Sequence, residues 1–279
     1  MHAVYDVALR RIDDFCSAHG LRSTLFAIGS DLERPQNGII LRGLSERGHA
    51  VENHSYAHRY DLSRWSRAEL LQDIAQAQDA ITKATGRTPS GFRAPGYTIN
   101  DLVLDVLEEL AFRFDSSVFP CPLYYGAKVM ILAGMRVFGR TSASVVDTPR
   151  VVAAPSRPYR PGTPWFVPGS RRLVELPIQV TPRLRLPVIG TTIGLAGPTA
   201  SRVLAHACAD EPLVNLELHG IDFLAASDGL EHLAAYQSEL RVPLSRRLDA
   251  LSAVVDTLLE RGVSFVRLDE AAESFHVRG

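Results

Sequence analysis

Apolar residues recur along the chain in two alternating patterns, one typical of helices and one typical of short buried strands. Val4, Ala8, Ile12 and Phe15 have helical spacing, and the β-branched run Thr24 to Ile28 then predicts a strand. Further helices are expected over 37–47, 66–81, 100–110 and 248–258, and further strands at 49–53, 91–93, 112–114, 213–218 and 263–266. This alternation predicts an α/β fold with a mainly parallel sheet, closed into a barrel or open.

The series of elements begins with a helix. In an α/β unit a helix follows a strand, and no strand pattern precedes the helix that starts near Val4. We therefore expect the first strand of the sheet to be missing, through a late start codon or a truncated chain. Repeats, low-complexity tracts and clear linkers are absent from the sequence, so residues 1–279 are expected to form a single domain.

Composition narrows the class of protein. The chain is 46% hydrophobic and 22% charged, which is ordinary for a globular protein, and its net charge of -1 argues against a nucleic-acid partner. Cys16, Cys121 and Cys208 are widely spaced and odd in number, which favours free thiols in a reducing compartment. Without a signal-peptide pattern, we expect a cytoplasmic location, with peripheral contact at the inner face of the membrane as an option.

The sharpest local signal is the pair His54 and His58, directly after the strand at 49–53. Two imidazoles four residues apart can converge on one metal ion, and neutral imidazole suits zinc, cobalt or nickel. Active sites of α/β folds lie past the ends of strands, where this pair is expected. The alternative is a pair of capping or surface histidines, and a metal site would still need a third ligand.

Two further segments carry candidate chemistry. Arg93 ends a predicted strand and could hold a carboxylate, and the turn at Pro95-Gly96 could point N–H groups at an oxyanion. His219 emerges where the apolar run 213–218 stops, so it could act as a general acid. The alternatives are a surface arginine before an ordinary Pro-Gly turn and a core histidine with satisfied hydrogen bonds.

In this order, the segments resemble the NodB-homology polysaccharide deacetylases, a family of metal-dependent N-deacetylases within the carbohydrate esterases. His54-Ser55-x-x-His58 resembles the family's metal motif, Arg93-Ala94-Pro95 its Arg-x-Pro segment, and Leu218-His219 its late Leu-His motif. The resemblance implies a deformed (β/α) barrel of about seven strands and a divalent transition metal, usually zinc, held by two histidines and one aspartate.

The resemblance also implies residue roles. His54 and His58 would be the metal ligands, Arg93 would orient the catalytic base, the N–H near Gly96 would bind the oxyanion, and His219 would protonate the leaving amine. The family's paired aspartates at the end of strand one have no counterpart here, because Asp6, Asp13 and Asp14 stand in a helical context. Glu175 and Asp222 are weak candidates for the partner of the late histidine.

Residues 120–174 read as an apolar and basic insertion. The stretch from Tyr124 to Gly139 is apolar except for Lys128 and Arg136, and the whole segment holds eight basic residues against one acidic residue, Asp147. It is too short to span a bilayer, but an apolar helix beside a basic cluster suits an anionic membrane surface or a lipid-phosphate substrate. The alternative is a helix packed on the fold beside a solvated basic loop.

The sequence thus predicts a hydrolase that removes an acetyl or formyl group from the nitrogen of an amino sugar, in a glycan or in a lipid-linked saccharide. The other hypothesis is a non-catalytic glycan- or lipid-binding relative that has lost the strand-one aspartates.

Overall fold

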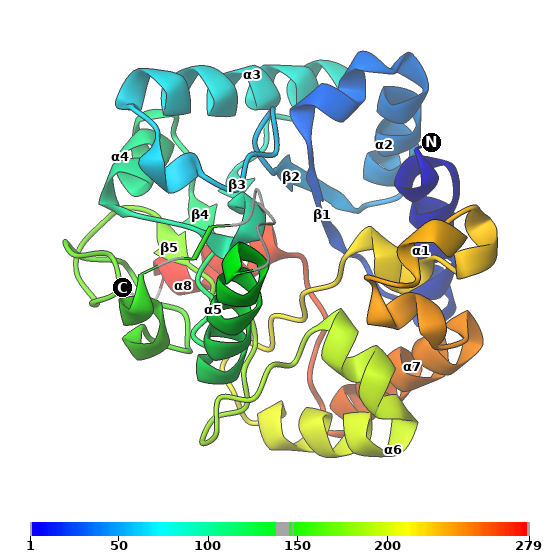
Figure 1. The fold of residues 1–279 in the computed structure, drawn as a ribbon. Coiled ribbons are helices and arrows are strands. Elements are labelled where there is room, and N and C mark those ends of the chain that lie inside the picture. Colours follow the sequence, from blue (N-terminus) through cyan, green and yellow to red (C-terminus); the bar gives the residue numbers. More distant parts are fainter. Residues whose placement is uncertain (1, 138–144, 147, 278–279) are drawn as a thin grey trace. The chain divides into compact units, whose positions relative to one another are not determined.

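The computed structural model describes residues 2–137, 145–146 and 148–277, and the fold is shown in Figure 1. The chain divides into two compact units. Unit 1 comprises residues 1–22 and 179–266, and unit 2 comprises residues 23–178 and 267–279. Each unit is described by itself. The sequence-based expectation of a single domain stays a prediction.

Unit 2 is built on a parallel sheet. Its strands are β1 (Thr24–Ala27), β2 (Ala50–Asn53), β3 (Gly91–Phe92), β4 (Phe114–Asp115) and β5 (Val174–Glu175). They pair in sequence order, each with the next, and all pairs are parallel. The predicted α/β class with a parallel sheet is therefore confirmed.

Helices α2 (Pro35–Glu46), α3 (Arg67–Thr85) and α4 (Asp101–Glu109) connect the strands of unit 2. The predicted helix over 66–81 begins with a capping box, since the Ser66 N–H donates to the Glu69 carboxylate at 2.8 Å and the Ser66 side chain caps the helix in return. Gly86 ends α3 in the left-handed conformation. The apolar faces of α3 and α4 bury a common core. It includes Leu70, Ile74, Leu104, Leu107 and Phe92.

The predicted insertion is the connection between the neighbouring strands β4 and β5. Its apolar stretch forms helix α5 (Pro122–Val137), followed by a short 3-10 helix over Pro149–Ala153. Arg140 and Asp147 lie outside the described residues, as does the side chain of Arg136. Helix α8 (Leu268–Val277) completes unit 2.

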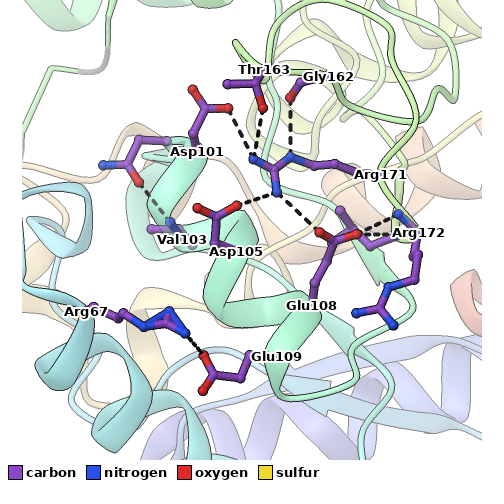
Figure 2. Close-up of polar contacts among 12 residues, drawn as sticks. Arg67, Asp101, Val103, Asp105, Glu108, Glu109, Gly162, Thr163, Arg171 and Arg172 are labelled. Atoms are coloured by element: carbon purple, nitrogen blue, oxygen red, sulfur yellow. Dashed lines mark hydrogen bonds and ion pairs between the residues drawn. The ribbon is translucent and has the colours of Figure 1, made fainter.

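The basic charge of the insertion is partly neutralised within unit 2. The Arg171 guanidinium reaches three carboxylates of α4, and Figure 2 shows them converging on it: Asp101 at 3.5 Å, Asp105 at 2.6 Å and Glu108 at 3.3 Å. The Arg172 backbone N–H also donates to Glu108, at 2.6 Å. Arg171 therefore anchors the end of the insertion to the fold, and an external anion would have to compete with these three acids for it.

Unit 1 is mainly helical. A π-helical turn (Val4–Ala8) leads into α1 (Leu9–Ala18), and α6 (Gly190–Cys208) packs along α7 (Leu244–Glu260). Two strands predicted in this unit are wrong. Residues 213–218 form only one isolated parallel bridge, between Glu217 and Ile189, and residues 263–266 have no strand partner among the described residues. An apolar run becomes a strand only when a neighbour supplies the ladder of hydrogen bonds.

The three cysteines are buried free thiols, as predicted. Among the described residues, no helix is both long and apolar enough to cross a membrane.

Candidate active site

The carboxyl ends of the parallel strands in unit 2 form one row. Asn53 at the end of β2 stands opposite Phe92 of β3, and Phe92 stands opposite Asp115 of β4. The next residues after β2 and β3 are His54 and Arg93, so the register brings two predicted site residues to the same edge of the sheet.

The ring of His54 is oriented by this edge. Its Nδ1 atom lies 2.6 Å from the backbone carbonyl oxygen of Arg93. Because a carbonyl oxygen only accepts, Nδ1 carries the proton and donates it, which leaves Nε2 with its lone pair. A histidine that binds a metal commonly donates its other ring N–H in this way.

His58 lies beside His54, with the two ring centroids 4.9 Å apart and the planes inclined by 57°. The turn that brings them together needs left-handed backbone at Ser55, with φ 64°, and at His58, with φ 50°. Such conformations cost energy outside glycine and persist where the surroundings hold them. The Ser55 hydroxyl contributes by accepting the His58 N–H at 3.0 Å.

Two further side chains fix this turn, and the sequence did not single them out. Buried Asp73 of α3 accepts the N–H groups of Tyr56 and Ala57 at 2.8 and 2.9 Å. Buried Asn53 accepts the Ser55 N–H at 2.8 Å. The available signal was a carboxylate on the apolar face of a helix, because Asp73 directly precedes Ile74 in the buried stripe of α3.

Arg93 is buried, so the alternative of a surface arginine is wrong. Its Nε donates to the Ser116 carbonyl oxygen at 2.8 Å and its Nη2 to the Ser116 hydroxyl at 2.7 Å. The guanidinium carbon lies 4.3 Å from the ring centroid of Phe26. These contacts hold the positive charge close to the edge that carries His54.

Gly96 has the left-handed backbone that its turn requires, with φ 64°. A Cβ atom at this position would lie 2.4 Å from the Tyr60 ring, so only glycine fits. The carbonyl oxygen of Gly96 accepts a hydrogen bond from Lys128 Nζ at 3.0 Å. Lys128 belongs to α5, so the insertion is attached to this turn.

A buried pair of carboxyl groups lies at the carboxyl ends of β4 and β5. Asp115 and Glu175 are register partners on β4 and β5, and both are fully buried. Burial raises the pKa of both, and the charge and hydrogen bond of Asp115 raise that of Glu175 well above its ordinary value. The raised pKa of Glu175 favours its protonated form, which is able to donate to Asp115. Asp115 accepts from the Ser117 hydroxyl at 2.7 Å.

His219 belongs to unit 1, whereas His54, His58, Arg93 and Gly96 belong to unit 2. Its side chain is 56% exposed, and Nδ1 lies 3.2 Å from a carboxylate oxygen of buried Glu217. Its backbone N–H donates to Asp222 at 2.7 Å. Burial raises the pKa of Asp222 to about 6, against the opposing effects of that N–H and of His219 itself. His219 is therefore not a core histidine.

Of the two partner candidates for His219, Asp222 contacts its backbone, while Glu175 belongs to unit 2. Glu217, the carboxylate at the His219 ring, was not singled out from the sequence. The signal that could have found it is an acid in the otherwise apolar run Leu216-Glu217-Leu218.

His54 and His58 suit the imidazole half of a metal site, since their rings are close and the Nε2 atom of His54 is left unprotonated. In the part of the chain that the structure describes, they are not joined by a third His, Cys, Asp or Glu in a group that could hold a metal. The two histidines fit the group, and a third protein ligand stays unassigned.

Comparisons with known proteins point to one family. The family model described as polysaccharide deacetylase matches residues 5–114. The peptidoglycan-N-acetylglucosamine deacetylase PgdA of Listeria monocytogenes is 32% identical over 93 residues, which are 33% of this chain and 19% of that protein. A chitin deacetylase of Pestalotiopsis sp is 26% identical over 102 residues, 36% of this chain and 34% of that protein. The matches thus span a third or less of the length of these relatives.

The fold has a solved counterpart. A crystal structure from Mycobacterium smegmatis, of a candidate polysaccharide deacetylase, aligns with 98% of this chain and 78% of its own, with a TM-score of 0.60 and 17% identity. At this identity the likeness concerns the fold alone.

Proposed function

Because residues 5–114 belong to the polysaccharide deacetylase family, we propose that this protein removes an N-acetyl group from an amino sugar of a glycan. The resemblance to this family is thereby confirmed, and the match spans the His54 and Arg93 motifs but not Leu218-His219. Two relatives named for deacetylation of peptidoglycan N-acetylglucosamine and of chitin support an N-acetylglucosamine unit as the substrate. A formyl group, the other acyl group expected from the sequence, has no such support.

One observation carries this proposal. The His54 and His58 rings meet at the carboxyl edge of a parallel sheet, on a turn held by Asp73. The Arg93 carbonyl oxygen accepts a hydrogen bond from Nδ1 of His54, so the ring proton is on Nδ1 and not on Nε2. A turn with two left-handed residues is costly to build, which favours a functional reason for it over two surface histidines.

Each residue of the candidate site has a distinct proposed role. His54 and His58 would hold a divalent transition metal, with zinc as the first choice for imidazole ligands. When bound, such a metal supplies Lewis-acid polarisation of a carbonyl and a water of lowered pKa. Arg93 places a buried positive charge near the edge where negative charge develops. The turn at Gly96 offers backbone N–H groups to the oxyanion.

His219 would protonate the leaving amine. The carboxylate of buried Glu217, 3.2 Å from Nδ1, would hold the imidazole ring in one orientation, as a positioned general acid requires.

The test combines metal content with turnover. Purified wild type is compared with His54→Ala, His219→Ala and the control His206→Ala, an exposed histidine on α6. Zinc is measured by mass spectrometry, and acetate release is measured on a chitin oligosaccharide. We expect His54→Ala to lose the metal, His206→Ala to resemble wild type, and His219→Ala to keep the metal while turnover falls by about 10²–10⁴.

Two results would contradict this assignment. Equal metal content in wild type and His54→Ala would remove the histidine pair from the site. Wild-type turnover in His219→Ala would remove that residue from the mechanism. Metal bound by wild type without any hydrolysis would favour the alternative, a non-catalytic glycan-binding relative.

A further inference from the structure

Helix α5 presents apolar side chains to solvent along one face. Leu123, Met130 and Ile131 are 62%, 76% and 63% exposed. With exposed Ala127 they follow the spacing of a single helical stripe, at positions i, i+4, i+7 and i+8. Exposed apolar residues are common singly, but a contiguous stripe of this kind marks an interaction surface.

The opposite face of α5 holds the charge. Lys128 is the charged residue of this helix whose side chain is described, and it points toward the rest of unit 2. Its Nζ donates to the Gly96 carbonyl oxygen and lies 6.0 Å from the Tyr124 ring centroid. A surface helix normally buries its apolar stripe and exposes its charges. In α5, Tyr125 packs against the core while Leu123, Met130 and Ile131 stay exposed, so packing on unit 2 does not explain the apolar stripe.

An exposed basic residue lies on a short helix that contacts α5. The short helix Pro149–Ala153 packs against α5 and carries Arg150, which is exposed and lies over the Phe166 ring at 5.5 Å. Arg157 and Arg172 are also exposed. The described residues between 120 and 174 include no Asp or Glu. Arg171, held by the acids of α4, is left out of this set (Figure 2).

We propose that the exposed face of α5, made of Leu123, Ala127, Met130 and Ile131, docks on the surface of an anionic lipid bilayer. An amphipathic helix with basic neighbours lies in the plane of such a surface and inserts its apolar side chains between the headgroups. Anionic headgroups complement Arg150, whereas a second copy of this chain would bring like charges together. With 16 residues, α5 is suited to lie along the interface.

Docking through α5 has a consequence for the substrate. The Lys128 hydrogen bond ties α5 to the Gly96 turn, so a bound membrane would lie next to the candidate active site. If the proposed deacetylation is right, the amino sugar is presented at the lipid surface, as a lipid-linked saccharide is. This consequence rests on the proposed function, but the docking itself does not.

The experiment uses the full chain and sedimentation with vesicles of neutral phosphatidylcholine, alone or mixed with phosphatidylglycerol, at low and high salt. The apolar variant is Leu123→Gln/Met130→Gln/Ile131→Gln. Its matched control is Ile39→Gln on α2, where the isoleucine is 64% exposed on the same unit. The charge variant is Arg150→Gln/Arg157→Gln. Thermal unfolding shows that each variant is folded.

Wild type and Ile39→Gln should sediment with anionic vesicles. The apolar variant should partition at least about 100-fold less, because each inserted side chain contributes about tenfold or more. The charge variant should lose about fivefold per arginine at low salt and little at high salt. His54→Ala should bind vesicles like wild type, which separates docking from the proposed function.

Wild type that stays in the supernatant under all conditions would overturn the proposal. So would equal loss of binding in Ile39→Gln and the apolar variant. Dimerisation that the apolar variant abolishes, without vesicle binding by wild type, would assign the face to a second copy of the chain and would also overturn it.

Discussion

Glu52 offers a quantitative test of the edge that carries His54. It lies on β2, two residues before His54, and it is only 4% exposed. Its Oε2 accepts the N–H groups of Ser90 and Gly91, each at 2.7 Å. Burial raises the pKa of the carboxyl group from its ordinary value of 4.5 to about 8. The two N–H groups oppose this rise, and Asp269 adds to it.

The sign of the effect on stability follows from proton linkage. Between the unfolded pKa near 4.5 and the folded pKa near 8, the folded protein keeps a proton that the unfolded chain has released. The stabilisation by the bound proton is therefore complete below the unfolded pKa and is lost as the pH rises through the folded pKa. A shift of this size corresponds to about 3–5 kcal/mol, at about 1.4 kcal/mol per pH unit.

The perturbation is Glu52→Gln, which keeps an acceptor oxygen for the two N–H groups and cannot ionise. The free energy of unfolding is measured by denaturant titration from about pH 5 to about pH 9 for wild type, Glu52→Gln and the control Glu46→Gln, an exposed glutamate on α2. Relative to wild type, Glu52→Gln should gain about 3–5 kcal/mol across this range.

Taking the difference between wild type and Glu52→Gln removes the contributions of other titrating groups that the two proteins share. The control should follow the pH dependence of wild type. Parallel curves for wild type and Glu52→Gln would refute the reasoning, because they would mean that Glu52 binds protons alike in the folded and unfolded states.

Further substitutions test Asp73 at the turn 55–58 and the buried carboxyl pair Asp115 and Glu175. Asp73→Asn weakens the acceptor of the Tyr56 and Ala57 N–H groups. Metal affinity, measured by isothermal titration, should therefore fall about 10- to 100-fold. Asp79→Asn, an exposed control on the same helix, should bind metal like wild type. Glu175→Gln should lower the free energy of unfolding by less than about 1 kcal/mol, because an amide can still donate to Asp115. Asp115→Asn should lower it by about 1–3 kcal/mol. The reverse ranking would show that Glu175 is ionised.

Sequence reasoning succeeded where the determining contacts are local. The helices over 66–81 and 100–110 were predicted, and their starts are set within one turn by the caps Ser66 and Asn100. The His54 and Arg93 motifs were placed at strand ends because apolar runs stop there. By contrast, the partnership of Asp73 with the turn at 55–58 depends on how α3 lies against β2, which no local pattern encodes.

The wrong strand predictions at 213–218 and 263–266 have a related cause. Both runs are apolar, but pairing depends on a neighbour that lies far away in the chain. The insertion shows the same limit. Its apolar helix and excess of basic residues could be read from composition, whereas the inward direction of Lys128 and the capture of Arg171 by α4 could not. Charge counts give the sum of charges and leave open which of them face solvent.

The register between β2 and β3 links this fold to its candidate chemistry. The N–H of Arg93 donates to the Asn53 carbonyl oxygen at 3.0 Å, which sets the two strand ends side by side. The carbonyl oxygen of Arg93 then accepts the Nδ1 proton of His54. One residue thus extends the strand ladder and selects the tautomer of the neighbouring imidazole. A slip of one residue would turn the Arg93 carbonyl away and leave Nε2 free to take the proton. The nitrogen that we propose to bind the metal is therefore specified by backbone pairing, which explains why residues 39 positions apart must be placed together.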